Sequence, residues 1–309
     1  MPPAVNKLLE KNMKLTKKQF SILVTLEADR KSKSQRELAA ASNLSVGTVN
    51  KLVAELSEQG MIRDGVITEA GIAALEPYRV KRAVFMAAGF GSRLVPITLN
   101  TPKPLVRVKG KRIIDSLLDA VVSAGIEEIY LVRGYLSEQF DQLLKKYPTI
   151  TFIENPMYNE TNNISSAYCA RHLFRNAYVF ESDLLLYNPK LITKYQYETN
   201  YLGVPTERTE DWCFTTGAQG YIKKMACGGT DCFHMYGISY WDEEDGAKLE
   251  KDIERVYNTP GGKERYWDQV ALDYCIESYN VRVRECSFSD IVEIDTFNEL
   301  KQIDKNYAM

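Results

Sequence analysis

Long apolar runs and closely paired cysteines are both missing from this 309-residue sequence. No stretch approaches the roughly 20 apolar residues that a membrane-spanning helix needs, and the first residues lack the apolar core of a signal peptide. The six cysteines include no Cys-x-x-Cys pair, and Cys227, Cys232 and His234 lack the fourth ligand and the spacing of a zinc site. We therefore expect a cytoplasmic protein without membrane insertion, with reduced cysteines and without zinc.

Two well-known phosphate-binding signatures are absent as well. A dinucleotide fingerprint needs a third glycine, as Gly-x-Gly-x-x-Gly, but Leu94 stands where that glycine would follow Gly89 and Gly91. No glycine is followed by Lys-Ser or Lys-Thr, which excludes a kinase-type P-loop. Histidine is scarce too, because only His172 and His234 occur, and we assign neither of them a role.

The sequence does contain a glycine-rich stretch of a third kind. Residues 83–94 read AVFMAAGFGSRL, a short apolar run that opens onto a Gly-x-Gly turn, and Pro-Lys-Pro follows at 102–104. This pattern predicts a buried strand and a turn whose backbone amides approach phosphate oxygens, because glycine has no Cβ to block them. Arg93 and Lys103 would add cationic donors for a polyphosphate.

Two further apolar segments end in acidic residues. The segment AYVFESD at 177–183 ends at Asp183, and IVEIDT at 291–296 carries Asp295. Open α/β sheets bind their ligands at the carboxyl ends of strands, and carboxylates opposite a phosphate-binding turn suit Mg²⁺. We therefore predict that Asp183 and Asp295 hold Mg²⁺. For either acid alone, a helix cap or a surface turn is the alternative.

The character of the chain changes at Arg82. The first 82 residues carry 14 Lys and Arg against 9 Asp and Glu, whereas the remainder is acidic. From Arg82 onward, short apolar runs alternate with helical segments, which is typical of an α/β sheet with parallel strands. We predict a first domain over 1–78, a connector to 81, and a second domain over 82–309.

The first domain has the pattern of a small helical module. Thr16 is placed to cap one helix, and Ser34 with Glu37 forms a capping box at the next. Residues 61–68 contain an Asp-Gly turn between apolar pairs and predict a two-stranded wing. A helix over 69–81 is expected to connect the two domains.

This order of elements resembles the winged helix-turn-helix domains of bacterial regulators. The resemblance implies DNA as a partner, bound through residues 34–68, with Ser45, Thr48 and Lys51 on the recognition helix and Arg63 on the wing. The charge excess is modest for phosphate binding. Packing or dimerisation therefore remains an equal alternative for this domain, and a homodimer stays open.

The glycine-rich stretch and Pro-Lys-Pro together resemble the signature of nucleotidyltransferases that make sugar and alcohol nucleotides. Over residues 82–305, motifs in shared order resemble bacterial CTP:phosphocholine cytidylyltransferases; they include Asp183, Tyr266-Trp267-Asp268 and Glu293-Ile294-Asp295. The metal strand departs from the family's frequent Asp-x-Asp, because Glu181 stands first. The resemblance implies an α/β fold with a Rossmann-like, GT-A-like mixed sheet. It also implies an Mg²⁺-dependent enzyme that converts CTP and phosphocholine into CDP-choline and pyrophosphate.

Site residues follow from this resemblance and from the chemistry of the substrates. Arg93 and Lys103 are the expected catalytic cations. The nucleotide would lie against one set of residues: Ala87, Ala88, Gly89, Gly91, Ser92, Gly134 and Tyr135. A trimethylammonium group is held by aromatic faces and carboxylates. We therefore predict a phosphocholine cage from a second set, whose members could instead be core or oligomer contacts: Tyr168, Trp212, Trp241, Tyr266, Trp267 and Asp268.

Two other functions remain open at this stage. A sugar-1-phosphate uridylyl- or thymidylyltransferase would share the glycine-rich turn, but its pocket would carry amides and carboxylates rather than tryptophans. A transcription regulator would use the second domain as a sensor of CTP or CDP-choline without turnover. The presence of Arg93, Lys103, Asp183 and Asp295 favours an active enzyme over a sensor.

Overall fold

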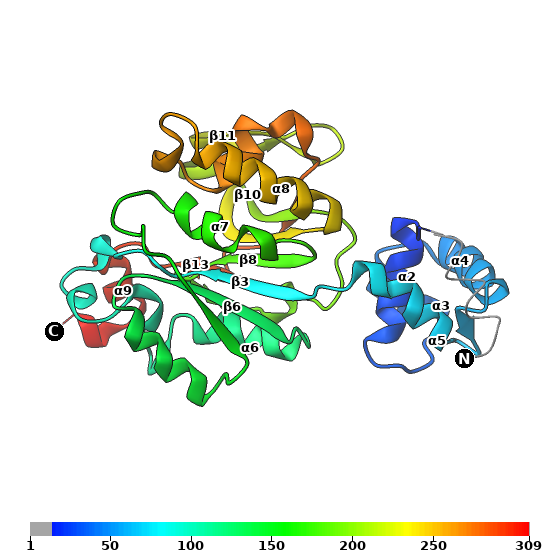
Figure 1. Cartoon of the computed structure of the whole chain (residues 1–309). Coiled ribbons are helices and arrows are strands. Elements are labelled where there is room, and N and C mark those ends of the chain that lie inside the picture. The colour runs from blue at the N-terminus through cyan, green and yellow to red at the C-terminus, as the bar shows by residue number, and fades with distance from the viewer. Residues whose placement is uncertain (1–13, 309) are drawn as a thin grey trace. The chain divides into compact units, whose positions relative to one another are not determined.

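The computed structural model describes residues 14–308, which fall into two compact units that divide between Arg79 and Val80. Figure 1 labels the elements of both units, and each unit is described by itself. Among the described residues, no helix is both long and apolar enough to cross a membrane.

The first unit is a three-helix core followed by a wing and a short helix. Its elements are α2 (Lys17–Glu27), α3 (Gln35–Ser42), α4 (Val46–Glu58), β1 (Ile62–Arg63), β2 (Val66–Ile67) and α5 (Glu69–Leu75). The predicted cap at Thr16 and capping box at Ser34 are confirmed. Each side chain accepts a hydrogen bond from the third helical amide, and the backbone N–H of each cap residue donates in return to the side chain of Gln19 or Glu37. Leu23 and Leu56, from α2 and α4, are fully buried in its core.

The wing of this unit has the expected form. Strands β1 and β2 pair antiparallel, with Ile62 opposite Ile67, and both residues of the Asp64-Gly65 turn have positive φ. The connecting helix is shorter than expected, because α5 ends at Leu75 and a 3₁₀ turn over Glu76–Tyr78 follows. Pro77 lies in that turn and cannot donate the backbone hydrogen bond that a continuing α-helix needs.

The second unit is built on a mixed seven-stranded sheet, which confirms the predicted fold class. In spatial order its strands are β12 (Arg282–Glu285), β10 (Asn200–Thr216), β11 (Ile222–Trp241), β8 (Ala177–Glu181), β3 (Arg82–Met86), β6 (Glu128–Arg133) and β7 (Ile150–Glu154). Strands β8, β3, β6 and β7 run parallel, whereas β11 is antiparallel to both β8 and β10. Strand β3 lies between β8 and β6 and ends just before the glycine-rich turn.

Helices cover both faces of this sheet. Along β3, Ala83 and Phe85 pack with α6 (Asp115–Ser123) in one apolar cluster, and Val84 and Met86 pack in a second. The second cluster contains residues of α7 (Ile164–Ala170) and α8 (Glu243–Tyr257). Figure 1 shows α7 and α8 above the strands and α6 below them. Alternate residues of the buried strand thus anchor the two helical layers.

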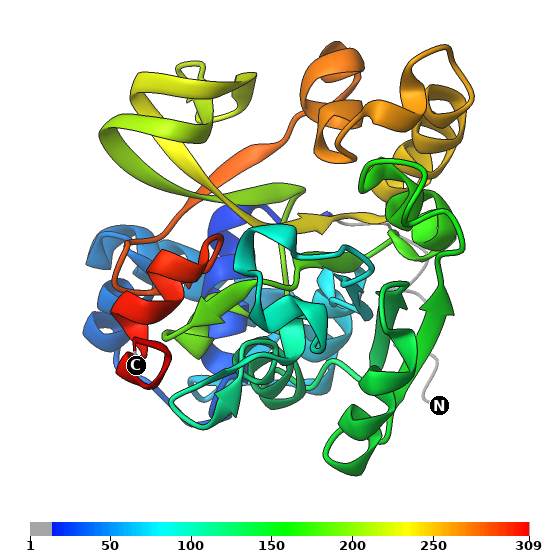
Figure 2. The ribbon, with the colours of Figure 1, turned by 90° about the vertical axis from the view of Figure 1, so that its left-hand side faces the viewer.

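Two short strands, separate from the main sheet, bring the C-terminal segment to the glycine-rich turn. Strand β9 (Leu184–Leu186) pairs antiparallel with β13 (Ile291–Glu293), with Leu184 opposite Glu293. The following helix, α9 (Phe297–Ile303), packs with Leu94 in a third apolar cluster. Figure 2 shows α9 in red. A smaller hairpin, β4 (Arg107–Val108) with β5 (Lys111–Arg112), completes the strands.

Candidate active site

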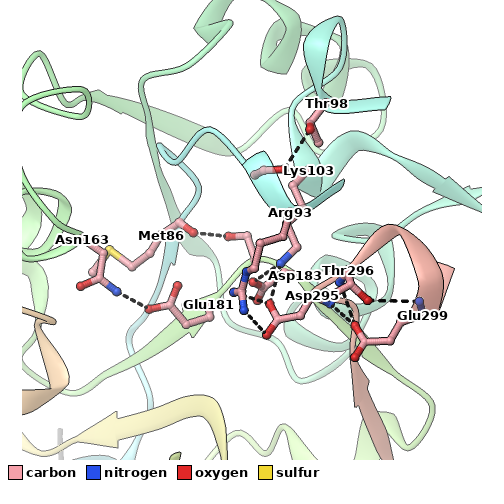
Figure 3. Close-up of polar contacts among 12 residues, drawn as sticks. Met86, Arg93, Thr98, Lys103, Asn163, Glu181, Asp183, Asp295, Thr296 and Glu299 are labelled. Atoms are coloured by element: carbon pink, nitrogen blue, oxygen red, sulfur yellow. Dashed lines mark hydrogen bonds and ion pairs between the residues drawn. The ribbon is translucent and has the colours of Figure 1, made fainter. Parts of the chain in front are cut away.

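The glycine-rich turn is held in one shape by contacts beneath it. Gly91 has a φ of +62°, and a Cβ there would lie 2.9 Å from Lys103 Cβ and 3.1 Å from Thr98 Cγ2. The Thr98 hydroxyl donates to the Gly91 carbonyl at 2.8 Å, as drawn in Figure 3. Only glycine combines this backbone conformation with so close an approach. The turn is therefore fixed against the segment that carries Lys103.

Lys103 lies between two carboxylates. Its Nζ donates to Asp183 Oδ2 at 2.8 Å and to Asp295 Oδ1 at 3.0 Å, and its side chain is only 9% exposed. Burial opposes the charge of the ammonium group, but Asp183 and Asp295 outweigh it and raise the pKa of Lys103. Lys103 is therefore a fixed cation at the floor of the site.

Arg93 reaches one of these two acids, Asp295, from the glycine-rich turn. Its guanidinium donates to both oxygens of Asp295, at 2.7 and 2.6 Å, while 63% of the side chain stays exposed (Figure 3). The structure thus brings together all four predicted phosphate and metal residues: Arg93, Lys103, Asp183 and Asp295. A planar, exposed guanidinium beside a buried ammonium suits an arriving polyphosphate.

A third acid, Glu293, joins the pair that the sequence predicted. Carboxylate oxygens of Asp183, Glu293 and Asp295 all lie within 4.8 Å of one another. The pairing of β9 with β13 makes this cluster, because Ile294 N donates to Asp183 O and so sets Asp183 against the Glu293–Asp295 segment. Glu293 and Asp295 are two residues apart and share a side of an extended chain, a signal that could have identified Glu293.

The three acids have the chemistry of a magnesium site. Asp183 Oδ1 is buried and has no hydrogen-bond partner, so one ligand oxygen is left over after Lys103 takes the other. Burial, together with the charges of Asp183 and Asp295, raises the pKa of Glu293 well above its ordinary value. A divalent cation would relieve this repulsion. An all-oxygen donor set of carboxylates is the set that Mg²⁺ prefers, so the residues present fit the ion.

A cavity of about 290 Å³ opens over this cluster. It is lined by the turn residues Ala87, Ala88, Gly89, Gly91, Ser92 and Arg93, and by Met86, Lys103, Pro104, Asn163, Ser166, Glu181, Ser182, Asp183 and Asp295. The Ser182 hydroxyl donates to Met86 O at 2.8 Å and ties the ends of β8 and β3 together beneath it. Cationic and acidic groups thus face one continuous space at the carboxyl ends of these strands.

Glu181 forms the far wall of this cavity. Its Oε1 accepts from Asn163 Nδ2 at 3.2 Å and from Trp267 Nε1 at 3.0 Å. Burial, with the neighbouring Asp268 and Asp183, raises the pKa of Glu181 well above its ordinary value. Asp268 accepts from the Tyr201 hydroxyl, and burial raises the pKa of Asp268 to about 7. The sequence drew attention to Glu181 only as a departure from the family pattern.

The predicted aromatic cage does not form around the cavity. Trp241 is fully buried, donates to Ser239 Oγ and packs edge-on against Trp267 and Tyr279. Trp267 is 1% exposed and also contacts Phe174. Both indoles are core residues because the sheet and α8 close over them, so neither offers a free ring face.

The other cage residues lie apart from these tryptophans. Tyr168 stacks on Tyr257, with the two ring centroids 4.3 Å apart, and Arg171 Cζ lies 4.1 Å from the ring centroid of Tyr168. Trp212 and Tyr266 contact each other edge-on at 5.6 Å, and 42% of Tyr266 is exposed. None of these three rings is among the described residues that line the cavity.

Gly134 and Tyr135, expected at the nucleotide, lie beside the glycine-rich turn but outside the described lining of the cavity. Tyr135 N donates to Ala88 O, and its hydroxyl donates to Thr98 O at 2.9 Å. Its ring contacts Phe90, which in turn contacts Tyr158. These residues brace the turn from the side of β6.

Two family descriptions match the chain. The description "Nucleotidyl transferase" matches residues 82–201, and "Winged helix-turn-helix DNA-binding" matches residues 15–63. The first match spans the glycine-rich turn, Lys103 and Asp183. The second spans α2 to β1 of the first unit.

Relatives with assigned activities cover the second unit almost completely. The chain is 34% identical over 229 residues to a 2-aminoethylphosphonate cytidylyltransferase of Lancefieldella rimae, covering 73% of this chain and 93% of that protein. It is 29% identical over 224 residues to a choline-phosphate cytidylyltransferase of Streptococcus pneumoniae, covering 72% and 97%. The solved structure of a CTP:phosphocholine cytidylyltransferase from S. pneumoniae matches with a TM-score of 0.68 and 30% identity, over 74% of this chain and 99% of that one.

Proposed function

The chain belongs to the nucleotidyltransferase family, among the cytidylyltransferases, and on that premise we propose that it transfers CMP from CTP to a small acceptor. The acceptor carries a phosphate or phosphonate at one end and a cationic nitrogen at the other. The observation that carries the proposal is the convergence of Arg93, Lys103 and three carboxylates on one cavity at the glycine-rich turn.

The glycine-rich turn is the site for the triphosphate. Gly89, Gly91 and Ser92 line the cavity, and a Cβ at Gly89 would meet nothing within 4 Å, so the backbone is open to a ligand there. Arg93 exchanges Asp295 for the β- and γ-phosphates, and Lys103 stabilises charge on the α-phosphate. The acceptor oxygen, already negative, attacks the α-phosphorus in line and pyrophosphate leaves. No protein nucleophile or base is needed.

Asp183, Glu293 and Asp295 would hold Mg²⁺ in this proposal. When bound, the ion supplies Lewis-acid stabilisation of phosphate charge. The pairing of β9 with β13 sets the spacing of the three acids, and the charges of Lys103 and Arg93 compensate the negative charge of these acids.

Two acceptors fit this description. Phosphocholine is the acceptor that the sequence resemblance implies, and two choline-phosphate cytidylyltransferases are relatives of this chain. 2-Aminoethylphosphonate is favoured by the Lancefieldella relative, which is 34% identical. Each molecule carries a phosphate or phosphonate at one end, and two carbons separate that group from a cationic nitrogen at the other end. Both therefore meet the requirement stated above for the acceptor.

The test is pyrophosphate release by the full-length protein with Mg²⁺. Four nucleoside triphosphates are crossed with phosphocholine, 2-aminoethylphosphonate, phosphoethanolamine and hexose-1-phosphates. Turnover with CTP and a cationic acceptor supports the proposal. Turnover with UTP or dTTP and a hexose-1-phosphate alone contradicts it, and so does CTP binding without turnover in any combination.

For the first unit we propose DNA as the partner, bound through residues 34–68. One supporting observation is the match of this unit to winged helix-turn-helix DNA-binding domains. The other is that the first turn of α4, which Ser45 caps, is exposed to solvent over residues 45–47. Thr48 and Lys51 follow on that helix, and Lys51 is 78% exposed. Retardation of duplex DNA at low salt, weakened by Lys51→Ala with Arg63→Ala, is the expected result. Failure across a genomic library contradicts this proposal.

A further inference from the structure

We propose that Glu181 selects an acceptor with a primary ammonium group, and so favours aminoalkyl phosphonates and phosphates over phosphocholine. This inference rests on the proposed cytidylyl transfer and names the acceptor class for the same cavity. Besides Asp183 and Asp295, a third carboxylate, that of Glu181, lines the cavity, and no aromatic ring is among the described lining residues.

The carboxylate of Glu181 has one committed oxygen and one open oxygen. Oε1 accepts from both Asn163 and Trp267, whereas Oε2 accepts no hydrogen bond within the described part of the chain. Figure 3 shows Asn163 holding the carboxylate from the side away from Asp183 and Asp295. An open oxygen on a cavity wall accepts an N–H or O–H from a ligand.

The surrounding backbone is shaped to keep Glu181 in this position. Gly237 of β11 lies against its stem, and a Cβ there would be 2.4 Å from Glu181 Cγ. Asn163 also accepts from Trp267 N at 2.9 Å, so the loop after α8 is locked to the start of α7. Glu181 is thus held by Asn163 at the start of α7 and by Trp267 on the loop after α8.

Charge favours an ammonium over a hydroxyl as the donor. Asp183 is two residues from Glu181 in the chain and lines the same cavity, and Asp268 directly follows Trp267, whose indole N–H donates to Glu181; Lys103 is the lysine that lines this cavity. Lys103 is already shared between Asp183 and Asp295. A cation beside Glu181 would therefore compensate a group of acids that the chain itself leaves in excess.

A trimethylammonium group gains much less at this wall. It has no N–H to offer the open oxygen and depends on aromatic faces. Two of the three tryptophans of the predicted cage are packed: Trp241 is fully buried, and Trp267 is 1% exposed and donates its own N–H to Glu181. The third, Trp212, pairs with Tyr266 and is not among the described residues that line the cavity. The structure therefore provides a hydrogen-bonding cation site in the place where a cage was expected.

The experiment is an N-methylation series with the full-length protein, CTP and Mg²⁺. The acceptors are phosphoethanolamine, its mono- and dimethyl derivatives and phosphocholine, with 2-aminoethylphosphonate alongside. We expect kcat/KM to fall along the series, by at least about tenfold from the primary to the quaternary amine. Equal or better use of phosphocholine overturns the inference and leaves cytidylyl transfer intact. Absence of pyrophosphate with every acceptor overturns the proposed function itself.

Glu181→Gln sharpens this test. The glutamine carbonyl can keep the bonds from Asn163 and Trp267, and only the open oxygen becomes an N–H₂ group. We expect kcat/KM for primary amines to fall about 10- to 100-fold through the acceptor KM, with the CTP KM unchanged and the thermal midpoint not lowered. The matched control is Glu264→Gln, the same change at an exposed position on the loop before Trp267. An unchanged amine series in Glu181→Gln overturns the inference.

One further readout separates Glu181 from the metal site. If Glu181 acts on the acceptor, the Mg²⁺ concentration for half-maximal activity stays within about twofold in Glu181→Gln. A tenfold or larger rise would place Glu181 among the metal ligands and overturn the inference.

Discussion

Lys103 Nζ donates to Asp183 Oδ2 at 2.8 Å, although the two residues are 80 positions apart in the chain. Lys103 is delivered by the Pro-Lys-Pro segment and Asp183 by the end of β8, and the same ammonium group also reaches Asp295. This pair joins the phosphate half of the site to its acidic half. Several of the expected effects of substitution depend on it.

Lys103→Ala should lower turnover by at least about 100-fold, because a fixed charge at the α-phosphate is removed from a site with little solvent. Circular dichroism should show the fold retained. The measurement is pyrophosphate release at saturating CTP. Turnover within threefold of the parent protein would show that Lys103 is a structural ion-pair partner only.

Asp183→Asn should also reduce turnover by orders of magnitude and should weaken Mg²⁺ binding. The amide removes one of three clustered carboxylates while keeping the acceptor oxygen that Lys103 bonds. Mn²⁺ binding followed by electron paramagnetic resonance measures the metal directly. Asp273→Asn, the same change at an exposed position, is the control and should leave both properties as they are.

Gly91→Ala and Gly89→Ala should separate stability from binding. The first puts a Cβ 2.9 Å from Lys103 Cβ at a positive φ, so we expect a loss of about 1 kcal/mol or more in the free energy of unfolding. The second meets open space and should leave stability within about 0.5 kcal/mol while weakening CTP binding. Chemical unfolding and CTP titration measure the two effects. Equal destabilisation by both changes would contradict this assignment.

Asp268→Asn should stabilise the protein increasingly as the pH rises. Burial raises the pKa of Asp268 from 3.8 to about 7, so between these values the folded state binds more protons than the unfolded state. The stability of the parent protein therefore falls as the pH rises from 3.8 through about 7, by at most about 4 kcal/mol from this group. Asparagine cannot ionise, so the variant does not lose this stability. Chemical unfolding of both proteins at pH 5 and pH 8 should show that Asp268→Asn increases the free energy of unfolding more at pH 8 than at pH 5.

Residues 80–309 alone should retain acceptor turnover with unchanged KM values. The S. pneumoniae structure is covered over 99% of its length by 74% of this chain, so such a transferase exists without a helix-turn-helix unit. Side-by-side kinetics of the full chain and the shortened chain check this. A loss of more than tenfold would show that the first unit contributes to the site.

Local sequence patterns were enough to predict much of this protein. The helix caps at Thr16 and Ser34, the Asp-Gly wing and the strand before the glycine-rich turn are each specified by a few neighbouring residues. Arg93, Lys103, Asp183 and Asp295 were predicted from the residue types that phosphate and metal chemistry demand at a glycine-rich turn and at strand ends. The structure places the four side chains together, and their roles stay a prediction.

The position of the aromatic side chains could not be predicted from local patterns. Trp241 and Trp267 stand beside acids in the sequence, but which ring faces are free depends on how β11 and α8 pack, and that packing buries both. Glu293 was passed over for a related reason. Its closeness to Asp183 comes from the register of β9 against β13, a pairing of strands about 100 residues apart.

The sequence by itself determined the two domain types, the glycine-rich turn and the chemical identity of the cations and acids, because these depend on short segments and on side-chain chemistry. Only the tertiary structure decided that Glu293 joins Asp183 and Asp295 in one acidic cluster, that Trp241 and Trp267 are core residues, and that Glu181 presents an open oxygen to the cavity. Those outcomes depend on strand register and on the burial of individual side chains, which are set by contacts between segments far apart in the chain.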